Sequence, residues 1–257
     1  MAQSRRIAEH LALPARSSHH TATQTGMLMG QTAMNKPPGA FAARYLDVLA
    51  SVYLYNEHRG YTALDRVLQA VRTRCPGETA FIAEVERHRA DEEKHYHMFR
   101  RWFERQGRMP LAMDRGVGHI DRFILTTFGC EIDQLDTGEV TSDPAAFERL
   151  CRVIMLTEQR GYRQVEILLR NGWVLADPIM TRIFKIVHRD EPGHYLPYQH
   201  WLERQGRAAA RWEEKLTDFW IHRKLLFGRI PALFLDPALP RLTRWPHEDD
   251  QPAAIAA

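Results

Sequence analysis

The chain has 257 residues, of which 44% are hydrophobic and 26% charged, a composition typical of a globular protein rather than a disordered or fibrous one. Its formal net charge of +3 lies entirely in residues 1–37, because the remaining 220 residues contain 31 basic and 31 acidic side chains. No net positive field is therefore expected over the fold, and nucleic acid is not a favoured partner.

Residues 1–37 are rich in Gln, Thr, Ser and Met, and we expect them to form a disordered leader. The stretch after the twin arginine Arg5-Arg6 is too short and too polar for a signal peptide, and no run of 18 apolar residues predicts a transmembrane segment. The cysteines are widely spaced and contain no Cys-x-x-Cys pair, which disfavours a zinc site or disulfide framework and favours a cytoplasmic location. They are Cys75, Cys130 and Cys151.

Apolar residues at helical spacing predict one long helix over residues 41–74 and a second over 78–107. Only the turn at Cys75-Pro76-Gly77 separates them, so they should form an antiparallel hairpin. The connection that follows, 109–143, is long enough to cross from one end of a bundle to the other, and we expect a short helix near 118–135.

A third helix is predicted over 144–171, because Asp143-Pro144 provides a cap and a first-turn proline. A fourth should run from 178 to 205, again joined to its predecessor by a short turn. Residues 208–227 should form one more helix, followed by a Pro-rich tail at 231–257. No segment alternates with a period of two, so strands are not expected.

The predicted fold class is therefore all-α. Two antiparallel helical hairpins, joined by a crossover segment, should form a four-helix bundle with an extra C-terminal helix, and residues 38–230 should be its domain.

The two hairpins repeat each other. Residues 91–108 and 190–207 are identical at ten of 18 positions with a constant offset of 99, where about one identity is expected by chance. The first and third helices match as well, since the pattern Glu-x-Arg-Gly-Tyr begins at both Glu57 and Glu158. The chain is thus predicted to be a duplicated hairpin.

Each repeat carries polar residues in mid-helix, where apolar ones would be expected. The motif Asp-Glu-x-x-His occurs at 91–95 and at 190–194, so the Glu and His of each motif share one helix face. Each hairpin has a further glutamate on its first helix: Glu57 lies 35 residues before Glu92, and Glu158 lies 33 residues before Glu191. In an antiparallel hairpin, the two glutamates of each pair should therefore lie at a similar height along the bundle. The candidate metal ligands are Glu57, Glu92, His95, Glu158, Glu191 and His194.

Four buried carboxylates would repel one another, and two divalent cations would neutralise them. A Glu from each of two helices and a Glu-x-x-His from each of the other two form a ligand set for two iron ions, two manganese ions or one of each. One His and two Glu per ion, with open positions, suit Fe(II) or Mn(II) better than zinc. The motif aspartates should orient the histidines crosswise, with Asp91 holding His194 and Asp190 holding His95.

Tyr61 and Tyr162 lie four residues after Glu57 and Glu158 and should point the same way. We assign them a catalytic role as residues that line the cavity or donate to a carboxylate, and core packing is the alternative. Five further histidines flank the motifs, but none has a histidine as its repeat counterpart, so they are not predicted to be ligands. They are His58, His88, His97, His188 and His200.

Over residues 41–207 the pattern resembles the ferritin-like di-iron carboxylate superfamily, and the Asp-Glu-x-x-His form of both motifs is similar to its oxygen-activating branch. The resemblance implies a ferritin-like bundle, two iron ions bridged by Glu92 and Glu191, and O₂ as co-substrate. The chain departs from the family pattern at Pro192-Gly193, where a kink or π-bulge is expected because proline removes a backbone donor.

The resemblance favours a di-iron oxygenase or oxidase that acts on a small or lipid-like organic substrate. Its electrons should come from an external donor, because the chain has no Cys-x-x-Cys module or flavin motif. Iron or peroxide handling, tRNA hydroxylation and a non-catalytic metal-stabilised bundle are the alternatives. The apolar, partly basic stretch between Phe219 and Leu235 should pack across the bundle or form a homodimer seam, with a membrane-surface role as the alternative.

Overall fold

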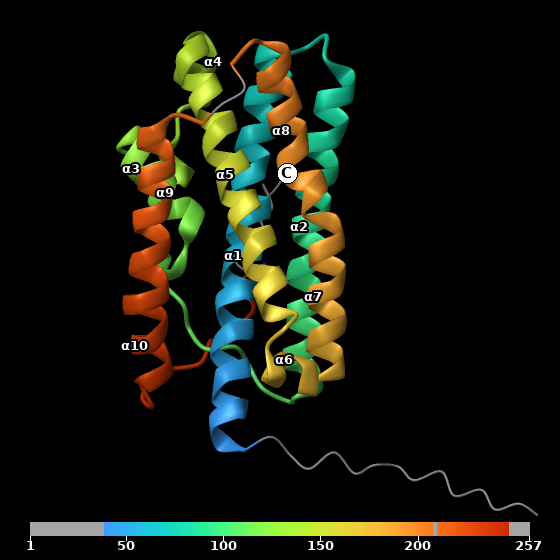
Figure 1. Cartoon of the computed structure of the whole chain (residues 1–257), viewed down its shortest axis with the longest axis vertical. Coiled ribbons are helices and arrows are strands. Elements are labelled where there is room, and N and C mark those ends of the chain that lie inside the picture. Colours follow the sequence, from blue (N-terminus) through green and yellow to red (C-terminus); the bar gives the residue numbers. More distant parts are fainter. Residues whose placement is uncertain (1–38, 208–209, 247–257) are drawn as a thin grey trace, which may run out of the picture. The chain divides into compact units, whose positions relative to one another are not determined.

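The computed structural model describes residues 39–207 and 210–246, and within these ranges the chain is all-helical, as predicted, with no strand (Figure 1). In this described part, Leu111 and Arg241 form an isolated antiparallel bridge. None of the described helices is long and apolar enough to cross a membrane. The predicted leader at 1–37 and the end of the predicted tail at 247–257 lie outside the described residues.

The first hairpin consists of α1 (Ala40–Arg74) and α2 (Thr79–Arg105). The turn between them begins where Cys75 donates its backbone N–H to the carbonyl of Val71 at 2.8 Å. Along most of α1 the buried side chains recur every three or four residues, because one stripe of the helix faces its neighbours. These two helices follow the predicted ranges to within two residues at each end.

The connection to the second hairpin contains four short helical segments. They are η1 (Arg115–Val117), α3 (His119–Phe128), η2 (Ile132–Gln134) and α4 (Thr137–Ser142). The single helix predicted near 118–135 is therefore shorter than expected. It ends at Gly129, whose φ of 72° is the left-handed conformation that glycine adopts without a steric penalty.

The second hairpin consists of α5 (Pro144–Leu168), the short α6 (Gly172–Ala176), α7 (Pro178–Asp190) and α8 (Pro192–Arg204). We call the two antiparallel sides of a hairpin its arms; in the second hairpin these are α5 and the pair α7 and α8. Both arms begin with an aspartate cap followed by proline. The side chain of Asp143 accepts from the N–H of Ala145 at 2.8 Å, and Asp177 accepts from the N–H of Ile179 at 2.9 Å.

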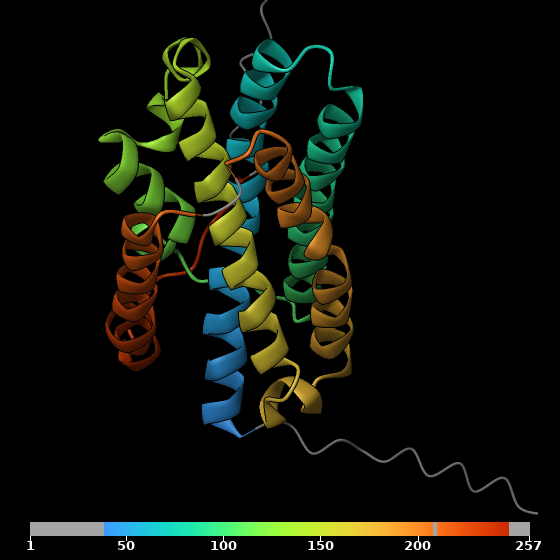
Figure 2. The same cartoon turned by 45° about the horizontal axis from the view of Figure 1, so that its top comes forward.

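The predicted fourth helix is not continuous, because it is interrupted at Glu191 between α7 and α8. Pro192 has no N–H to donate to the carbonyl of His188, and proline inside a helix clashes with the preceding turn. Helix α8 leans away from the axis of α7, as the two orange helices of Figure 2 show. Of the two expected outcomes, the structure has a kinked break.

The two hairpins pack against each other through α2, α7 and α8. Trp102, near the end of α2, donates its indole N–H to Asp177 at the start of α7 at 2.9 Å. Its repeat counterpart Trp201, near the end of α8, donates to Glu78 at the start of α2, also at 2.9 Å. The C-terminal end of each arm therefore lies beside the N-terminal end of the other, so the arms are antiparallel.

Two further helices are tied to the hairpins by equivalent ion pairs. Arg59 on α1 binds Asp121 on α3 at 2.8 Å. Arg160, at the same place in the second repeat, pairs with Asp218 on α9 (Trp212–Lys224). Each Arg lies two residues after a candidate ligand, so these ion pairs anchor α3 and α9 beside the middle of the long helices.

The predicted tail is packed as far as residue 246. A π-helical turn, Leu225–Arg229, leads from α9 into α10 (Ile230–Leu235), so 231–235 is helical. The guanidinium of Arg44 on α1 donates to the carbonyl of Leu233 at 2.8 Å, and Arg241 pairs with Asp47. These contacts hold the segment against α1.

Candidate metal centre

The sequence-predicted ligands lie together in the interior. Glu57 comes from α1, Glu92 and His95 from α2, and Glu158 from α5, and the second motif lies at the start of α8. The histidines of both motifs are fully buried, Glu57, Glu92 and Glu191 are buried, and Glu158 is half-buried. Glu57, Glu92, His95 and Glu158 lie in mid-helix, whereas Glu191 lies at the junction of α7 and α8.

Two groups of ligand atoms, each lying within 4.8 Å of one another, emerge from this arrangement. The first contains Glu57, Glu92 and His95. The second contains Glu92 again, with the side chains His88, Glu158 and His194. Glu92 belongs to both groups, which is the position that a carboxylate bridging two ions would occupy.

The imidazole Nδ1 atoms face the carboxylates. In the first group, Nδ1 of His95 lies 3.4 Å from Glu57 Oε2. In the second group, Nδ1 of His194 lies 3.1 Å from Glu92 Oε1. Glu191 lies beside the second group, with its Oε2 atom 3.7 Å from Nδ1 of His194. Five of the six predicted ligands are therefore members of a group, and the sixth is adjacent.

The far nitrogens of these histidines face the aspartates of the opposite motif, in the crosswise arrangement that the sequence predicts. Nε2 of His95 lies 3.2 Å from Asp190 Oδ2, and Nε2 of His194 lies 3.8 Å from Asp91 Oδ2. Lys94 links the two aspartates, because its ammonium group binds Asp190 at 2.7 Å and also pairs with Asp91. A proton on each Nε2 would leave Nδ1 free to act as a ligand.

The electrostatics of the cluster fit a site for cations. Burial raises the pKa of Glu57 to about 7 and that of Glu191 to about 8, with Glu92 contributing to both. Burial opposes protonation of His95, but Asp190 and Glu57 outweigh it and raise the pKa of His95 to about 9. Without a counter-cation, the carboxyls therefore retain protons near neutral pH, and a divalent ion would displace them.

Several buried polar atoms of the cluster have no hydrogen-bond partner in the described structure, although such groups are almost always paired. These atoms are Nδ1 of His95, Nδ1 and Nε2 of His194, Nε2 of His88 and Oε2 of Glu191. Histidine nitrogens and carboxylate oxygens are the donor atoms that iron and manganese accept. The residues therefore fit a pair of such ions, which would satisfy the atoms that the protein leaves unpaired.

Two glycines make room for the carboxylates. A Cβ atom on Gly60 would lie 2.2 Å from Glu92 Oε2, so any larger residue would displace that carboxylate. At the equivalent Gly161, a Cβ atom would lie 3.2 Å from Glu191 Oε1. Sequence reasoning missed this role, although the signal was present, because both glycines follow a candidate ligand at the same spacing in the repeat.

His88, which was predicted not to be a ligand, lies in the second group of ligand atoms. It is fully buried, and its ring stacks on His194 with centroids 4.2 Å apart. Burial, followed by the two motif histidines, holds the pKa of His88 well below its usual range, so the ring is neutral. Comparison of the repeats offers no reason to select His88, because its counterpart is Val187.

A second residue that sequence reasoning missed is Tyr53, one turn before Glu57 on α1. Its hydroxyl is buried and has no hydrogen-bond partner in the described structure. Burial, and then the charges of Glu191 and Glu57, hold the pKa of this phenol well above its usual range. The group is therefore a neutral O–H close enough to Glu191 and Glu57 to be influenced by their charges.

The two tyrosines predicted to be catalytic lie near aromatic neighbours. Tyr61 is buried against His58 and Tyr96, with ring centroids 5.3 and 5.8 Å away. Tyr162 is half-buried and stacks on His188 at 4.6 Å. Neither belongs to the two ligand groups. Their catalytic role stays a prediction, with packing contacts now established for both.

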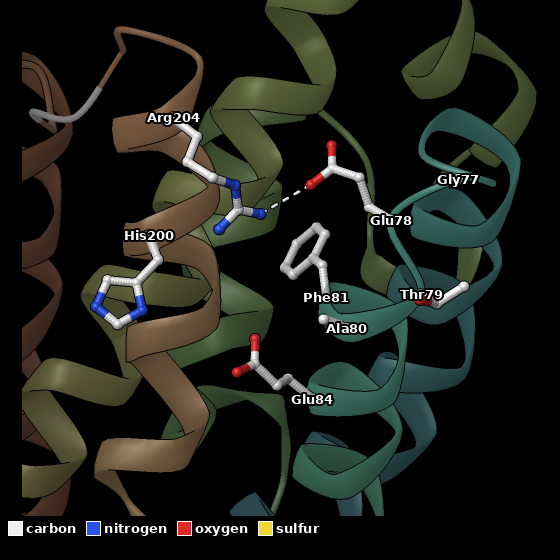
Figure 3. A pocket seen from close by; sticks show the side chains of 8 residues that line it. All are labelled: Gly77, Glu78, Thr79, Ala80, Phe81, Glu84, His200 and Arg204. Atoms are coloured by element: carbon white, nitrogen blue, oxygen red, sulfur yellow. Dashed lines mark hydrogen bonds and ion pairs between the residues drawn. The ribbon is translucent and has the colours of Figure 1, made fainter. Parts of the chain in front are cut away.

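A cavity of about 360 Å³ opens elsewhere on the molecule, between the start of α2 and α8 (Figure 3). Phe81 lies at its base, and the ion pair of Arg204 with Glu78, 2.8 Å long, closes one side. None of the candidate metal ligands lines this cavity, so it is separate from the centre.

Comparisons with family models, curated proteins and solved structures give no match for this chain. The class that the fold and the site define is therefore stated from the residues alone: an all-α protein with buried His/Glu groups able to bind metal.

Proposed function

We propose that the chain is a ferritin-like di-metal carboxylate protein that activates O₂ to oxidise a small or lipid-like organic substrate. The observation that carries the proposal is the pair of buried His/Glu groups sharing Glu92, built from two copies of one motif. Glu57 and His95 would hold one ion, Glu158 and His194 the other, with Glu92 between them and Glu191 beside them.

Two iron ions in this site would supply the electrons and the open coordination positions that reaction with O₂ needs. For hydroxylation, one O₂, two electrons and two protons would give one hydroxylated product and one water. An external electron donor must therefore act with the protein, because the chain carries no redox module of its own. Manganese in one or both positions would fit the same ligands.

The protein's own groups prepare the site in three ways. Asp190 binds Nε2 of His95, and Asp91 lies 3.8 Å from Nε2 of His194, so that Nδ1 of each histidine would face the ions. The aromatic rings of Tyr53, Phe99 and Phe184 pack together beside the cluster, with centroids 4.9 to 5.6 Å apart, and exclude water. Glu57 and Glu191 release their protons when cations bind, as their raised pKa values require.

The test is anaerobic titration of the metal-free protein with Fe(II), followed by exposure to O₂. We expect two ions to bind per chain and O₂ to be consumed, with oxidised product from at least one member of a panel of apolar organic compounds. His95→Ala and His194→Ala should each lose one ion. Glu93→Ala is the matched control, because Glu93 neighbours Glu92 but pairs with Arg89 outside the cluster.

The alternatives predict different results. Binding of fewer than two ions by the parent protein would refute the metal site. Iron oxidation without product, combined with assembly into a large cage on size-exclusion chromatography, would replace the oxygenase proposal with iron storage. Salt-sensitive retention of tRNA would favour the tRNA-modifying alternative. Unchanged melting with and without metal would exclude a purely structural role for the ions.

A further inference from the structure

His88 occupies a position for which the duplicated motif has no equivalent. It lies one helical turn before Glu92 on α2, so the two side chains share a helix face. Its Nε2 atom is 3.8 Å from Glu92 Oε1 and 3.7 Å from Glu158 Oε1. The ring therefore lies beside both carboxylates of the second ligand group.

The other nitrogen of His88 has its own partner. Nδ1 lies 3.4 Å from the hydroxyl oxygen of Tyr198, a fully buried residue on α8. A proton on Nδ1 that is donated to this oxygen leaves a lone pair on Nε2, directed at the two carboxylates. Nε2 has no hydrogen-bond partner in the described structure, so nothing in that part of the protein uses the lone pair.

The repeat supplies an internal comparison. At the offset of 99, Val187 takes the place of His88, and Phe99 takes the place of Tyr198. Both replacements are fully buried and belong to one apolar cluster. The histidine and the hydroxyl that orients it thus occur together on one side of the centre, and both are absent at the equivalent position on the other side.

We propose that His88 is a third histidine ligand, which binds through Nε2 to the ion held by Glu158 and His194. The inference rests on the proposed di-metal centre. It makes the two ions inequivalent, because one would have two nitrogen ligands and the other only His95. Tyr198 is the positioning residue that selects the tautomer of His88.

The test counts histidine ligands by proton NMR of the Co(II)-loaded protein, in which each ligand imidazole N–H gives a solvent-exchangeable, strongly shifted resonance. We expect three such resonances in the parent protein and two in His88→Val, the residue that the other repeat carries. His88→Val should also weaken one of the two Co(II) binding steps by at least about tenfold. Tyr198→Phe should keep both ions and broaden the His88 resonance through faster solvent exchange.

Two resonances in the parent, or three in His88→Val, would overturn the assignment of His88. A parent that binds no Co(II) would instead refute the di-metal centre itself, so the two failures are distinguishable. His88→Gln retains a polar side chain of similar length and serves if His88→Val does not fold. It should likewise show two resonances.

An independent observation concerns α9, whose polar and apolar faces are reversed. Its buried face carries Glu214, which binds Arg152 at 2.9 Å, and Asp218, which pairs with Arg160 and His119. Its outer face is aromatic and aliphatic. The exposed large apolar side chains there and in the following turn are Trp212, Leu216, Phe219, Trp220, Leu226 and Phe227, and we call this set the α9 surface.

Cations surround the α9 surface. Among the described residues of α9, the exposed charged side chains are Lys215, Arg223 and Lys224 against Glu213 alone. The guanidinium of Arg223 lies over the rings of Phe219 and Phe227, at 5.6 and 4.7 Å from their centroids. Exposed patches of this kind are rare on proteins that act alone. Two copies of this surface placed face to face would bring like charges together, whereas an anionic partner would be attracted.

We infer that the α9 surface docks onto an anionic lipid bilayer. Trp and Phe side chains enter the interfacial region, and Lys and Arg pair with lipid phosphates. This inference does not depend on the metal centre, although it agrees with a lipid-like substrate.

Vesicle co-sedimentation tests the surface. We expect roughly a hundredfold preference for phosphatidylglycerol over phosphatidylcholine vesicles, lost at high salt, because three cations face the membrane. The double variant Trp220→Ser/Phe227→Ser should lose binding, whereas Ile167→Ser, which removes an equally exposed apolar side chain of α5, should not. Absence of vesicle binding by the parent would overturn the inference. So would a parent dimer that the double variant converts to a monomer, because that result would make the surface an interface between copies.

Discussion

The two hairpins carry the same metal-binding motif but differ in what surrounds it. In the first hairpin, α2 runs without interruption through Asp91–His95, and Lys94 links the two aspartates. In the second, Pro192 breaks the helix at the equivalent place, and Gly193 stands where Lys94 stands in the first. The duplication thus retained the groups that would hold ions, while the support of those groups diverged.

The difference also extends to the side chains behind the ligands. His88 and Tyr198 lie behind one group, and Val187 and Phe99 lie at the equivalent places behind the other. One side of the centre is polar and has an additional candidate ligand, and the other is apolar. The comparison teaches that a duplicated site need not be a symmetric one, because residues outside the motif are free to change independently.

The largest expected effect comes from the residue common to both groups. Glu92→Ala should abolish high-affinity binding of both ions, because each group then loses a carboxylate that would neutralise and bind its ion. Glu57→Ala and Glu158→Ala should each remove only one ion. Metal content after equilibrium dialysis, measured by mass spectrometry, checks this. Retention of one tight ion in Glu92→Ala would show that the carboxylate is not shared.

The crosswise aspartates give the next effect. Asp190→Asn should lower the affinity of the ion bound by His95 about tenfold to a hundredfold, because Asn cannot accept as strongly from Nε2–H. Asp91→Asn should act on the other ion and have a smaller effect, since its contact is 3.8 Å rather than 3.2 Å. Competition with a chromogenic chelator measures both. Equal losses at the same ion would contradict crosswise pairing.

The two glycines test the closeness of the carboxylates. Gly60→Ala should weaken metal binding about tenfold, because its Cβ atom would lie 2.2 Å from Glu92 Oε2. Gly161→Ala should weaken it less, since the distance there is 3.2 Å. The metal-free protein should lose little stability, as alanine gains about 1 kcal/mol of helix propensity over glycine. Isothermal titration calorimetry, with thermal melting alongside, compares the two variants. The reverse order of affinities would contradict the geometry.

The pH dependence of stability follows from the buried carboxyls. In the metal-free folded state, the pKa of Glu57 is about 7 and that of Glu191 about 8, above the ordinary value of 4.5. Between the ordinary pKa of 4.5 and the folded-state values of about 7 and about 8, the folded state therefore binds more protons than the unfolded state. The free energy of unfolding consequently falls as pH rises through this range. His95, with a pKa of about 9, acts in the same direction.

The melting temperature of the metal-free protein should accordingly fall by about 5 °C or more between pH 6 and pH 9. Saturation with Mn(II) should remove most of this fall, because the ions replace the protons. Differential scanning calorimetry at matched ionic strength measures it. A metal-free melting temperature that rises over the same range would refute the assigned protonation.

The smallest expected effect comes from removing the proline at the break between α7 and α8. Pro192→Ala should restore an N–H that can donate to the carbonyl of His188 and stabilise the protein by about 1 kcal/mol. The second hairpin would then resemble the first. Denaturant unfolding measures the gain, with Pro197→Ala in α8 as the comparison. A loss of stability at Pro192→Ala would show that the kink is needed for packing.

Much of the fold was predictable from local patterns. Turn residues and helix caps placed the long helices, because capping and proline geometry act within a few residues of the chain. The repeat predicted which polar residues would lie near one another, and each motif aspartate lies across from the histidine of the other motif, with a hydrogen bond between His95 and Asp190. The short helices of the connection were less predictable, since their positions depend on contacts between residues far apart in the sequence, such as the ion pair of Arg59 with Asp121.

The sequence by itself determined the helical class, the duplication and the identity of the six candidate ligands, because these depend on spacing along the helix and on comparison between repeats. Only the tertiary structure decided that His88 joins the cluster, that the Tyr53 hydroxyl is buried without a partner in the described structure, that Glu191 lies beside a group, and that α9 buries carboxylates and exposes aromatic rings. The physical reason is that these features depend on how side chains from different helices meet, and helical spacing does not record which neighbour each face receives.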